Sequence, residues 1–119
     1  MSRWTRWIKL AYGDEWFPEN TKYSGPAIYE LGVGGPRYGN TEPVYVGETG
    51  NLRKRLSAYG EDGSHLREEI DDVLADGYAL YYRYQRRRSK RTARRSEKNY
   101  LDKYDYDWNI QSNTEDENW

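Results

Sequence analysis

Two tyrosines and an arginine stand where predicted strands end and a helix follows. Tyr45 closes a short β-branched and aromatic run, and Tyr29 lies in an earlier strand-like run, 25–31. Arg55 follows Tyr45 in a predicted helix. A strand-end tyrosine and an arginine about two helical turns later can converge beside the edge of a sheet. Because phenols can take part in proton transfer and a guanidinium can stabilise negative charge, this convergence is the first candidate site.

The segment between Tyr45 and Arg55 predicts how these side chains are positioned. Gly47 and Gly50 are expected to permit a sharp structural turn after the strand. Asn51 can cap the helix predicted at 52–58. In that helix Leu52 and Leu56 are spaced i, i+4, which gives the helix a buried stripe. The basic residues 53–55 are then left on the flanks of the stripe.

Three further polar residues are candidates for chemistry, and each has a structural alternative. His65, the sole histidine, begins a predicted helix, where it could serve the site or simply face solvent. Glu97 is the only carboxylate between positions 77 and 101. It could hold a hard divalent cation or act as a counter-charge for the cations around it. Asn109 could belong to the site or only cap or bridge backbone groups.

Charge is segregated along the chain, although the net value is only −1. Residues 83–103 hold ten Lys/Arg and two acids, whereas the rest holds nine basic and eighteen acidic residues. This asymmetry predicts a basic surface for a polyanion on an acidic body, with a solvated helix face as the alternative. The predicted nucleic-acid contacts are Arg53, Lys54, Arg86, Arg87, Arg88, Lys90, Arg91, Arg94 and Arg95.

The 119 residues have room for one domain with a modest core. Strands are expected at 25–31, 43–46 and 78–84, and helices at about 52–58, 65–76 and 89–104. The predicted fold is therefore α+β, a small central, mainly antiparallel three-stranded sheet flanked by helices. Residues 1–24 are expected to form an aromatic arm or extra strand over the core, with a base-stacking platform as the alternative. The acidic tail, 112–119, is expected to be disordered.

Composition and motif spacing argue against several classes of protein and site. The chain has no cysteine, so disulfides and thiolate metal sites are excluded, which fits a reducing compartment. No apolar run approaches membrane-spanning length, and the N-terminus lacks a signal-peptide core. We therefore expect a cytoplasmic protein with no membrane partner. The glycine-rich connection 32–42 lacks phosphate-loop spacing, which argues against nucleotide binding.

Two short segments resemble the signatures of the GIY-YIG nuclease superfamily. They are Ala27-Ile28-Tyr29, with alanine in place of the first glycine, and Tyr45-Val46-Gly47. The resemblance extends to an arginine eight residues after Gly47, a histidine at the start of the next helical segment, a later glutamate and a terminal asparagine. It covers roughly 25–111, which is expected to be a GIY-YIG-like nuclease domain. The site residues that it implies are Tyr29, Tyr45, Arg55, His65, Glu97 and Asn109.

This resemblance implies a divalent-metal-dependent endonuclease that hydrolyses DNA. It places one Mg²⁺ (or Mn²⁺) on Glu97 as a Lewis acid, with Arg55 donating to the non-bridging phosphate oxygens. Tyr29, supported by Tyr45, would bind or deprotonate the attacking water. His65 could accept or relay the proton instead, and the identity of the general base stays open.

Two alternatives belong to other functional classes. One is a catalytically silent nucleic-acid-binding module that keeps the fold and the basic helix. The other is a subunit of a larger complex that docks through its N-terminal tryptophans. DNA is the expected partner, RNA is not excluded, and a homodimer or larger complex is left open.

Overall fold

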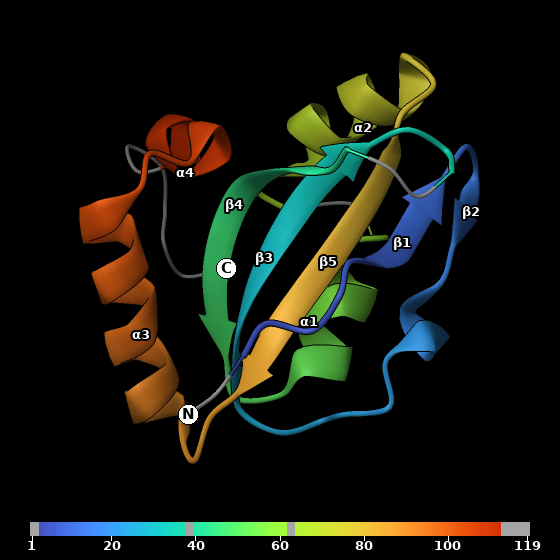
Figure 1. The fold of residues 1–119 in the computed structure, drawn as a ribbon. Coiled ribbons are helices and arrows are strands. Elements are labelled where there is room, and N and C mark those ends of the chain that lie inside the picture. Colours follow the sequence, from blue (N-terminus) through green and yellow to red (C-terminus); the bar gives the residue numbers. More distant parts are fainter. Residues whose placement is uncertain (1–2, 38–39, 62–63, 113–119) are drawn as a thin grey trace.

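An antiparallel five-stranded sheet forms the centre of the computed structural model, which describes residues 3–37, 40–61 and 64–112. The strands lie in the order β2-β1-β5-β3-β4, and every neighbouring pair is antiparallel (Figure 1). They are β1 (Ile8–Tyr12), β2 (Glu15–Trp16), β3 (Ala27–Gly34), β4 (Glu42–Thr49) and β5 (Ala79–Arg86).

The number of strands differs from the prediction. The α+β class and the antiparallel arrangement are confirmed, but the sheet has five strands rather than three. β1 pairs with the edge of β5 that β3 leaves free, with Ile8 opposite Tyr82 and Tyr12 opposite Ala79. This pairing satisfies backbone groups that an exposed edge of β5 would leave to water.

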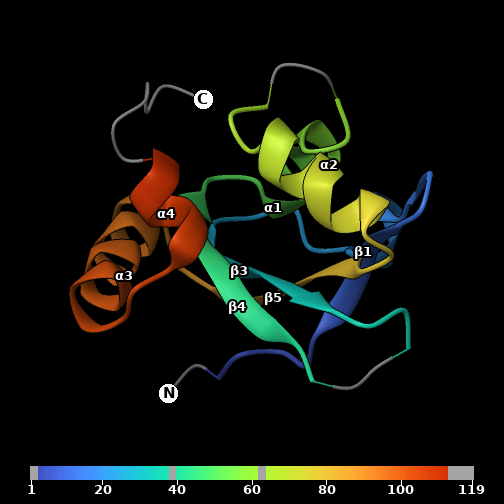
Figure 2. The same ribbon diagram turned by 90° about the horizontal axis from the view of Figure 1, so that it is seen from above.

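Helices cover one face of the sheet and flank its β4 edge. They are α1 (Leu52–Ala58), α2 (Arg67–Ala75), α3 (Lys90–Lys103) and α4 (Asp107–Ser112), with a 3-10 turn, η1, at Pro18–Asn20. α1 and α2 lie over one face, whereas α3 and α4 lie beside β4 (Figures 1 and 2). Among the described residues, no helix has the length and apolarity that crossing a membrane requires. Of the predicted acidic tail, residues 113–119 lie outside the described residues.

Local sequence signals account for where α1 and α3 begin and where α2 ends. Asn51 caps α1, because its side chain accepts a hydrogen bond from the backbone N–H of Lys54 at 3.1 Å. Ser89 caps α3 in a reciprocal capping box with Thr92. α2 ends before Gly77, whose φ of 91° is readily adopted only by glycine.

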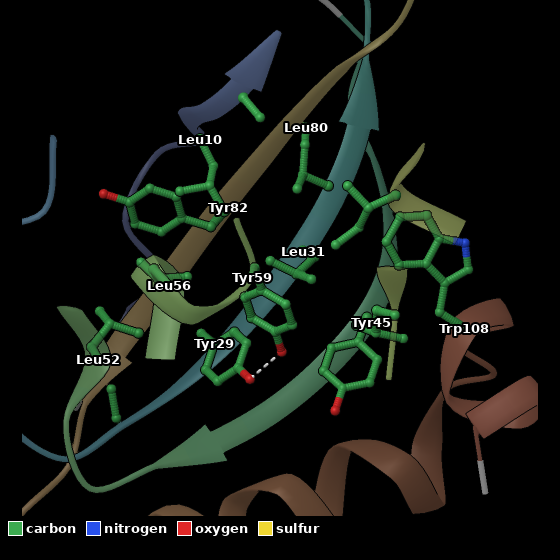
Figure 3. Packing of buried hydrophobic residues seen from close by; sticks show 14 residues of the cluster. Leu10, Tyr29, Leu31, Tyr45, Leu52, Leu56, Tyr59, Leu80, Tyr82 and Trp108 are labelled. Atoms are coloured by element: carbon green, nitrogen blue, oxygen red, sulfur yellow. Dashed lines mark hydrogen bonds between the residues drawn. The ribbon is translucent and has the colours of Figure 1, made fainter. Parts of the chain in front are cut away.

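The alternation of side chains along β3 and β4 creates two clusters on opposite faces of the sheet. Tyr29 and Tyr45 belong to the larger cluster, which α1 and α2 cover with leucine, isoleucine and tyrosine side chains (Figure 3). Ile28 and Val46 point the other way and pack with Tyr106 in a smaller cluster. Because side chains alternate along a strand, every second residue of β4 faces α3.

The N-terminal tryptophans are used in packing. Trp16 packs against the larger cluster and Trp4 against the smaller one. Trp7 and Trp4 both lie against the guanidinium of Arg83, at 4.4 and 5.0 Å from the ring centroids. The side chains of Trp4, Trp7 and Trp16 are all partly buried. In this segment β1 and β2 extend the sheet, and the tryptophans pack against the two clusters and Arg83.

Candidate active site

The hydroxyl of Tyr29 is the centre of a hydrogen-bonded group contributed by β3, α1 and the edge strand β4. Its Oη lies 2.6 Å from Tyr59 Oη, and it accepts an N–H from Arg55 Nη1 at 3.4 Å (Figure 3 shows the tyrosine pair). Arg55 Nη1 also donates to the carbonyl oxygen of Glu48 at 3.2 Å. Both phenols are fully buried, while Arg55 is partly exposed. The guanidinium thus connects a buried phenol pair to a surface that an anion can reach.

Gly47 makes room for the two signature tyrosines, although the sequence predicted a structural turn there. It lies inside β4, directly opposite Tyr29, and the strand continues to Thr49. A Cβ on Gly47 would come 2.6 Å from Tyr29 Cζ and Oη and 3.0 Å from Tyr45 Cε2. The prediction of a turn was therefore wrong. The position requires glycine because two aromatic rings occupy the space of a side chain.

Tyr45 connects the phenol pair to the only histidine. Its ring centroid lies 6.3 Å from that of Tyr29, and its Oη lies 3.4 Å from His65 Nε2. His65 is partly exposed and precedes α2 by two residues, where Ser64 Oγ holds the turn by accepting the Leu66 N–H at 3.2 Å. The helix expected from residue 65 therefore starts later, and the imidazole lies in the turn that leads into it.

Burial shifts the titration of these groups in opposite directions. It raises the pKa of Tyr29, although Arg55 and the hydrogen bond from Tyr59 act against the shift. Burial also raises the pKa of Tyr45. It lowers the pKa of His65, and the positive charge of Arg55 lowers it further. At neutral pH the tyrosines are therefore protonated and the imidazole is uncharged and able to accept a proton.

Two carboxylates from different elements approach the same edge of the sheet. Glu97 is partly buried on α3, and burial together with the charge of Glu48 raises its pKa to about 7, against the opposing charges of Arg55 and Arg94. Glu48 Oε1 lies 3.9 Å from Arg94 Nε, a long ion pair. Glu48 Oε2 is buried and has no hydrogen-bond partner among the described residues. Negative charge is thus incompletely compensated here.

A sequence model described as "GIY-YIG domain-containing protein" matches residues 11–118. The chain belongs to the GIY-YIG family. A mutant of EndoII from bacteriophage T4 has a similar solved structure, with a TM-score of 0.50 and 22% identity over 72% of this chain and 65% of that chain. At this identity the likeness concerns the fold alone, which is the GIY-YIG nuclease fold.

Two proteins of Arabidopsis thaliana are similar in sequence. "Protein EFFECTOR OF TRANSCRIPTION 3" is 37% identical over 98 residues, which is 74% of this chain and 37% of that protein. "Protein EFFECTOR OF TRANSCRIPTION 2" is 32% identical over 120 residues, covering 77% of this chain and 25% of that protein. The GIY-YIG chain described here therefore spans only 37% and 25% of the length of these two relatives.

Asn109 of this GIY-YIG chain is committed to the backbone of β4. Its Oδ1 accepts the Val46 N–H at 2.8 Å, and its Nδ2 donates to the Val46 carbonyl at 3.0 Å. The side chain is buried and continues the hydrogen bonding of the edge strand, as a neighbouring strand would. Of the two readings that the sequence left open, the geometry favours the bridging of backbone. Asn109 holds the strand that carries Tyr45 and Glu48.

The predicted nucleic-acid contacts divide into exposed cations and one structural arginine. Arg87 is partly buried and donates to Ser96 Oγ at 2.7 Å and to Gln85 Oε1 at 2.7 Å, so it holds the connection between β5 and α3. The sequence predicted Arg87 as a phosphate contact, but these hydrogen bonds give it a structural role instead. The others are exposed: Arg53, Lys54, Arg86, Arg88, Lys90, Arg91, Arg94 and Arg95.

Tyr59 and Glu48 join the site although the sequence did not single them out. Tyr59 is one of thirteen tyrosines, and only the packing of the end of α1 on β3 distinguishes it. For Glu48 a signal was available. Strand alternation places it on the same side as Val46, which faces α3, so it could have been placed near Glu97.

The carboxylates fit the metal that GIY-YIG chemistry implies, with a small protein ligand set. Among the described residues, no group of three or more His, Asp or Glu side chains could enclose a cation. Glu97 and Glu48 nonetheless offer oxygen ligands, one with a raised pKa and the other with a buried oxygen that lacks a partner. Mg²⁺ prefers such hard ligands and keeps several of its waters, so one or two carboxylates suffice.

Proposed function

We propose that this chain is a divalent-metal-dependent endonuclease that hydrolyses DNA phosphodiester bonds. The observation that carries the proposal is a convergence at the β4 edge of the sheet. β3 and β4 supply two tyrosines, α1 an arginine, the turn before α2 a histidine, and α3 a glutamate. Such hydrolysis needs an activated water, stabilisation of charge on the phosphorus and departure of the 3′ oxygen.

Arg55 is suited to stabilise the charge that grows on the non-bridging oxygens. Its guanidinium is oriented by the Tyr29 hydroxyl and the Glu48 carbonyl, yet part of it reaches solvent. Because both of these acceptors are fixed in the sheet, the guanidinium is oriented before a phosphate arrives. Tyr59 acts as a positioning residue, since it touches Tyr29 and lies fully buried.

His65 is the best supported general base. Its lowered pKa leaves it neutral at physiological pH, and it is more exposed than either signature tyrosine. With Nε2 unprotonated, Tyr45 Oη donates to it, so a proton leaving a water bound at Tyr45 can pass to the imidazole. The raised pKa values of Tyr29 and Tyr45 disfavour either phenolate as the resting base.

Glu97, with Glu48 beside it, would hold the divalent cation. When bound, the cation supplies Lewis-acid stabilisation on the leaving-group side. The exposed arginines and lysines of α3 and α1 would position the duplex through its phosphates without reading its sequence.

A DNA-binding module without turnover is the second candidate. It is favoured by the printed names of the two Arabidopsis relatives, which describe effectors of transcription, and by the exposed cations, which would serve binding alone. Binding and cleavage must therefore be measured separately.

The decisive experiment compares two arginines of α1. Supercoiled plasmid, labelled single strands and RNA are incubated with the wild-type protein, Arg55→Gln and Arg53→Gln, in Mg²⁺, Mn²⁺ or EDTA. Arg53 is exposed, loses the same charge and serves as the matched control. We expect metal-dependent cleavage that Arg55→Gln reduces by at least two orders of magnitude, whereas Arg53→Gln, which removes a single phosphate contact, should reduce it only a few-fold. Tight DNA binding without cleavage under every condition would favour the silent module, and equal loss in both variants would make Arg55 an ordinary surface cation.

A further inference from the structure

A pocket with aromatic walls lies on the sheet face opposite Tyr29, away from the groups that the proposed cleavage uses. Its volume is about 400 Å³, and four of its eight lining residues are aromatic. Trp4 comes from the N-terminal arm, Tyr100 from α3, and Tyr104 and Tyr106 from the connection between α3 and α4. The lining includes none of the side chains of the candidate active site, although Tyr100 follows Glu97 by about one turn of α3.

The rings stand at different angles around this space. Trp4 and Tyr100 meet edge to face, with centroids 5.2 Å apart and planes at 60°. Tyr100 and Tyr104 are stacked at 6.1 Å, and Tyr104 meets Tyr106 at 6.4 Å and 77°. The π face of an aromatic ring carries partial negative charge and attracts a cation placed over it. A group of rings at varied angles can therefore surround a compact cation.

The charges in the wall leave a negative balance at the pocket mouth. Arg83 forms an ion pair with Glu30, with Nη2 and Oε1 2.6 Å apart, and these two charges cancel. Tyr106 Oη donates to the other oxygen of Glu30 at 2.5 Å. The remaining ionised side chain in the lining is the exposed carboxylate of Asp105. This carboxylate favours a cation over a phosphate at the pocket mouth.

One wall of the pocket already accommodates a cation. The guanidinium carbon of Arg83 lies 5.0 Å from the centroid of Trp4, within the range of a cation–π contact. The buried carboxylate of Glu30 is engaged on both oxygens. A primary ammonium has three N–H donors to satisfy, whereas the Glu30 carboxylate is buried and already accepts from Arg83 and Tyr106. A methylated ammonium has fewer or no donors and can pack its methyl groups on the rings.

We propose that this pocket binds a methylated ammonium group. The same chemistry is present in the side chain of a trimethylated lysine and in choline-type small molecules. Charge complementarity comes from Asp105, and shape complementarity from Trp4, Tyr100, Tyr104 and Tyr106.

The test is a titration followed by NMR chemical shifts in the full chain at constant ionic strength. The probes are tetramethylammonium, choline, a trimethyl-lysine peptide and the same peptide with unmodified lysine. A neutral isostere of choline, 3,3-dimethylbutanol, measures the apolar contribution alone. We expect saturable shifts around the pocket with every methylated cation, and weaker binding of unmodified lysine and of the isostere. Preference for the peptide over choline would identify a lysine side chain as the source, and the reverse would identify a small molecule.

Tyr104 allows a matched set of variants because it is 55% exposed and can be changed at little cost to folding. Tyr104→Leu should weaken binding about two- to five-fold through loss of one ring face, and Tyr104→Phe should not. Tyr78→Leu removes a similarly exposed tyrosine outside the pocket and is the control. Asp105→Asn should weaken binding of cations but not of the isostere. Absence of shifts at tens of millimolar, or equal binding of the isostere and choline, would overturn the proposal.

Discussion

Tyr29 lies directly opposite Gly47 in the β3–β4 ladder, and its phenol occupies the volume in which a side chain at position 47 would stand. The two signature segments are thus complementary halves of one packing arrangement. The tyrosine of the first segment fills the space left by the glycine of the second. This contact sets where the Tyr29 hydroxyl meets Arg55.

Replacement of Gly47 by alanine should therefore disturb both stability and the site. The new Cβ would lie 2.6 Å from Tyr29 Cζ and Oη, and the fully buried ring cannot move away freely. We expect a loss of about 1–3 kcal/mol in the free energy of unfolding, as for overpacked cores, together with reduced DNA cleavage. Gly50→Ala is the control, since the nearest atom to its new Cβ lies at 3.7 Å. Chemical denaturation measures both variants, and equal stabilities would contradict the steric argument.

Loss of the Tyr59 hydroxyl should destabilise the fold modestly and loosen the position of Tyr29. Tyr59→Phe removes the partner at 2.6 Å from Tyr29 Oη while keeping the ring in the core. The expected loss is about 1 kcal/mol, that of one buried neutral hydrogen bond. Tyr78→Phe, at an exposed tyrosine, should cost nothing measurable. An unchanged melting temperature for Tyr59→Phe would mean that the buried hydroxyl pair contributes no net stability.

Glu97 should destabilise the metal-free protein at neutral and alkaline pH. Its pKa is about 7 in the folded chain, against 4.5 for an ordinary glutamate, so the folded state holds the proton more tightly than the unfolded state does. Stability from this group is therefore highest in acid and is lost as pH rises from about 4.5 to about 7. In EDTA, Glu97→Gln should raise the melting temperature by a few degrees at pH 8 and hardly at pH 4.5.

The same variant tests the metal site without relying on activity. Mg²⁺ should raise the melting temperature of the wild type at pH 8 and leave Glu97→Gln unaffected, because a ligand that binds the folded state stabilises it. Glu68→Gln, on the exposed side of α2, is the charge-matched control. A variant less stable than the wild type in EDTA at pH 8 would instead identify Glu97 as a counter-charge for the basic helix.

The exposed cations at the start of α3 should supply phosphate contacts. Lys90 lies beside the turn at Gly50, and Arg94 lies 3.9 Å from Glu48, so both border the candidate active site. The double variant Lys90→Gln/Arg94→Gln should weaken DNA binding and reduce the log–log salt slope by about 0.9 per lost contact. Lys98→Gln/Lys103→Gln removes two exposed cations further along the helix for comparison. Affinity across a salt series measures the slope, and an unchanged slope would place these cations against solvent.

Much of the framework could be predicted from local sequence. The β-branched and aromatic runs predicted β3, β4 and β5, and the i, i+4 spacing of Leu52 and Leu56 predicted α1 with Arg55 beside its buried stripe. Capping by Asn51 is likewise a local signal. These features depend on residues a few positions apart, whose geometry the backbone period sets before any tertiary contact forms.

Tertiary structure alone decided which of several equivalent residues belong to the site. Tyr59 contacts Tyr29, and Arg87 donates to Ser96 instead of joining the basic surface, because of how α1 and α3 pack against the sheet. Asn109 pairs with the backbone of Val46 across 63 positions of sequence. Periodicity tells which face of a strand or helix a side chain occupies, but not which distant element meets that face. That depends on strand order and on the burial that the whole chain achieves at once.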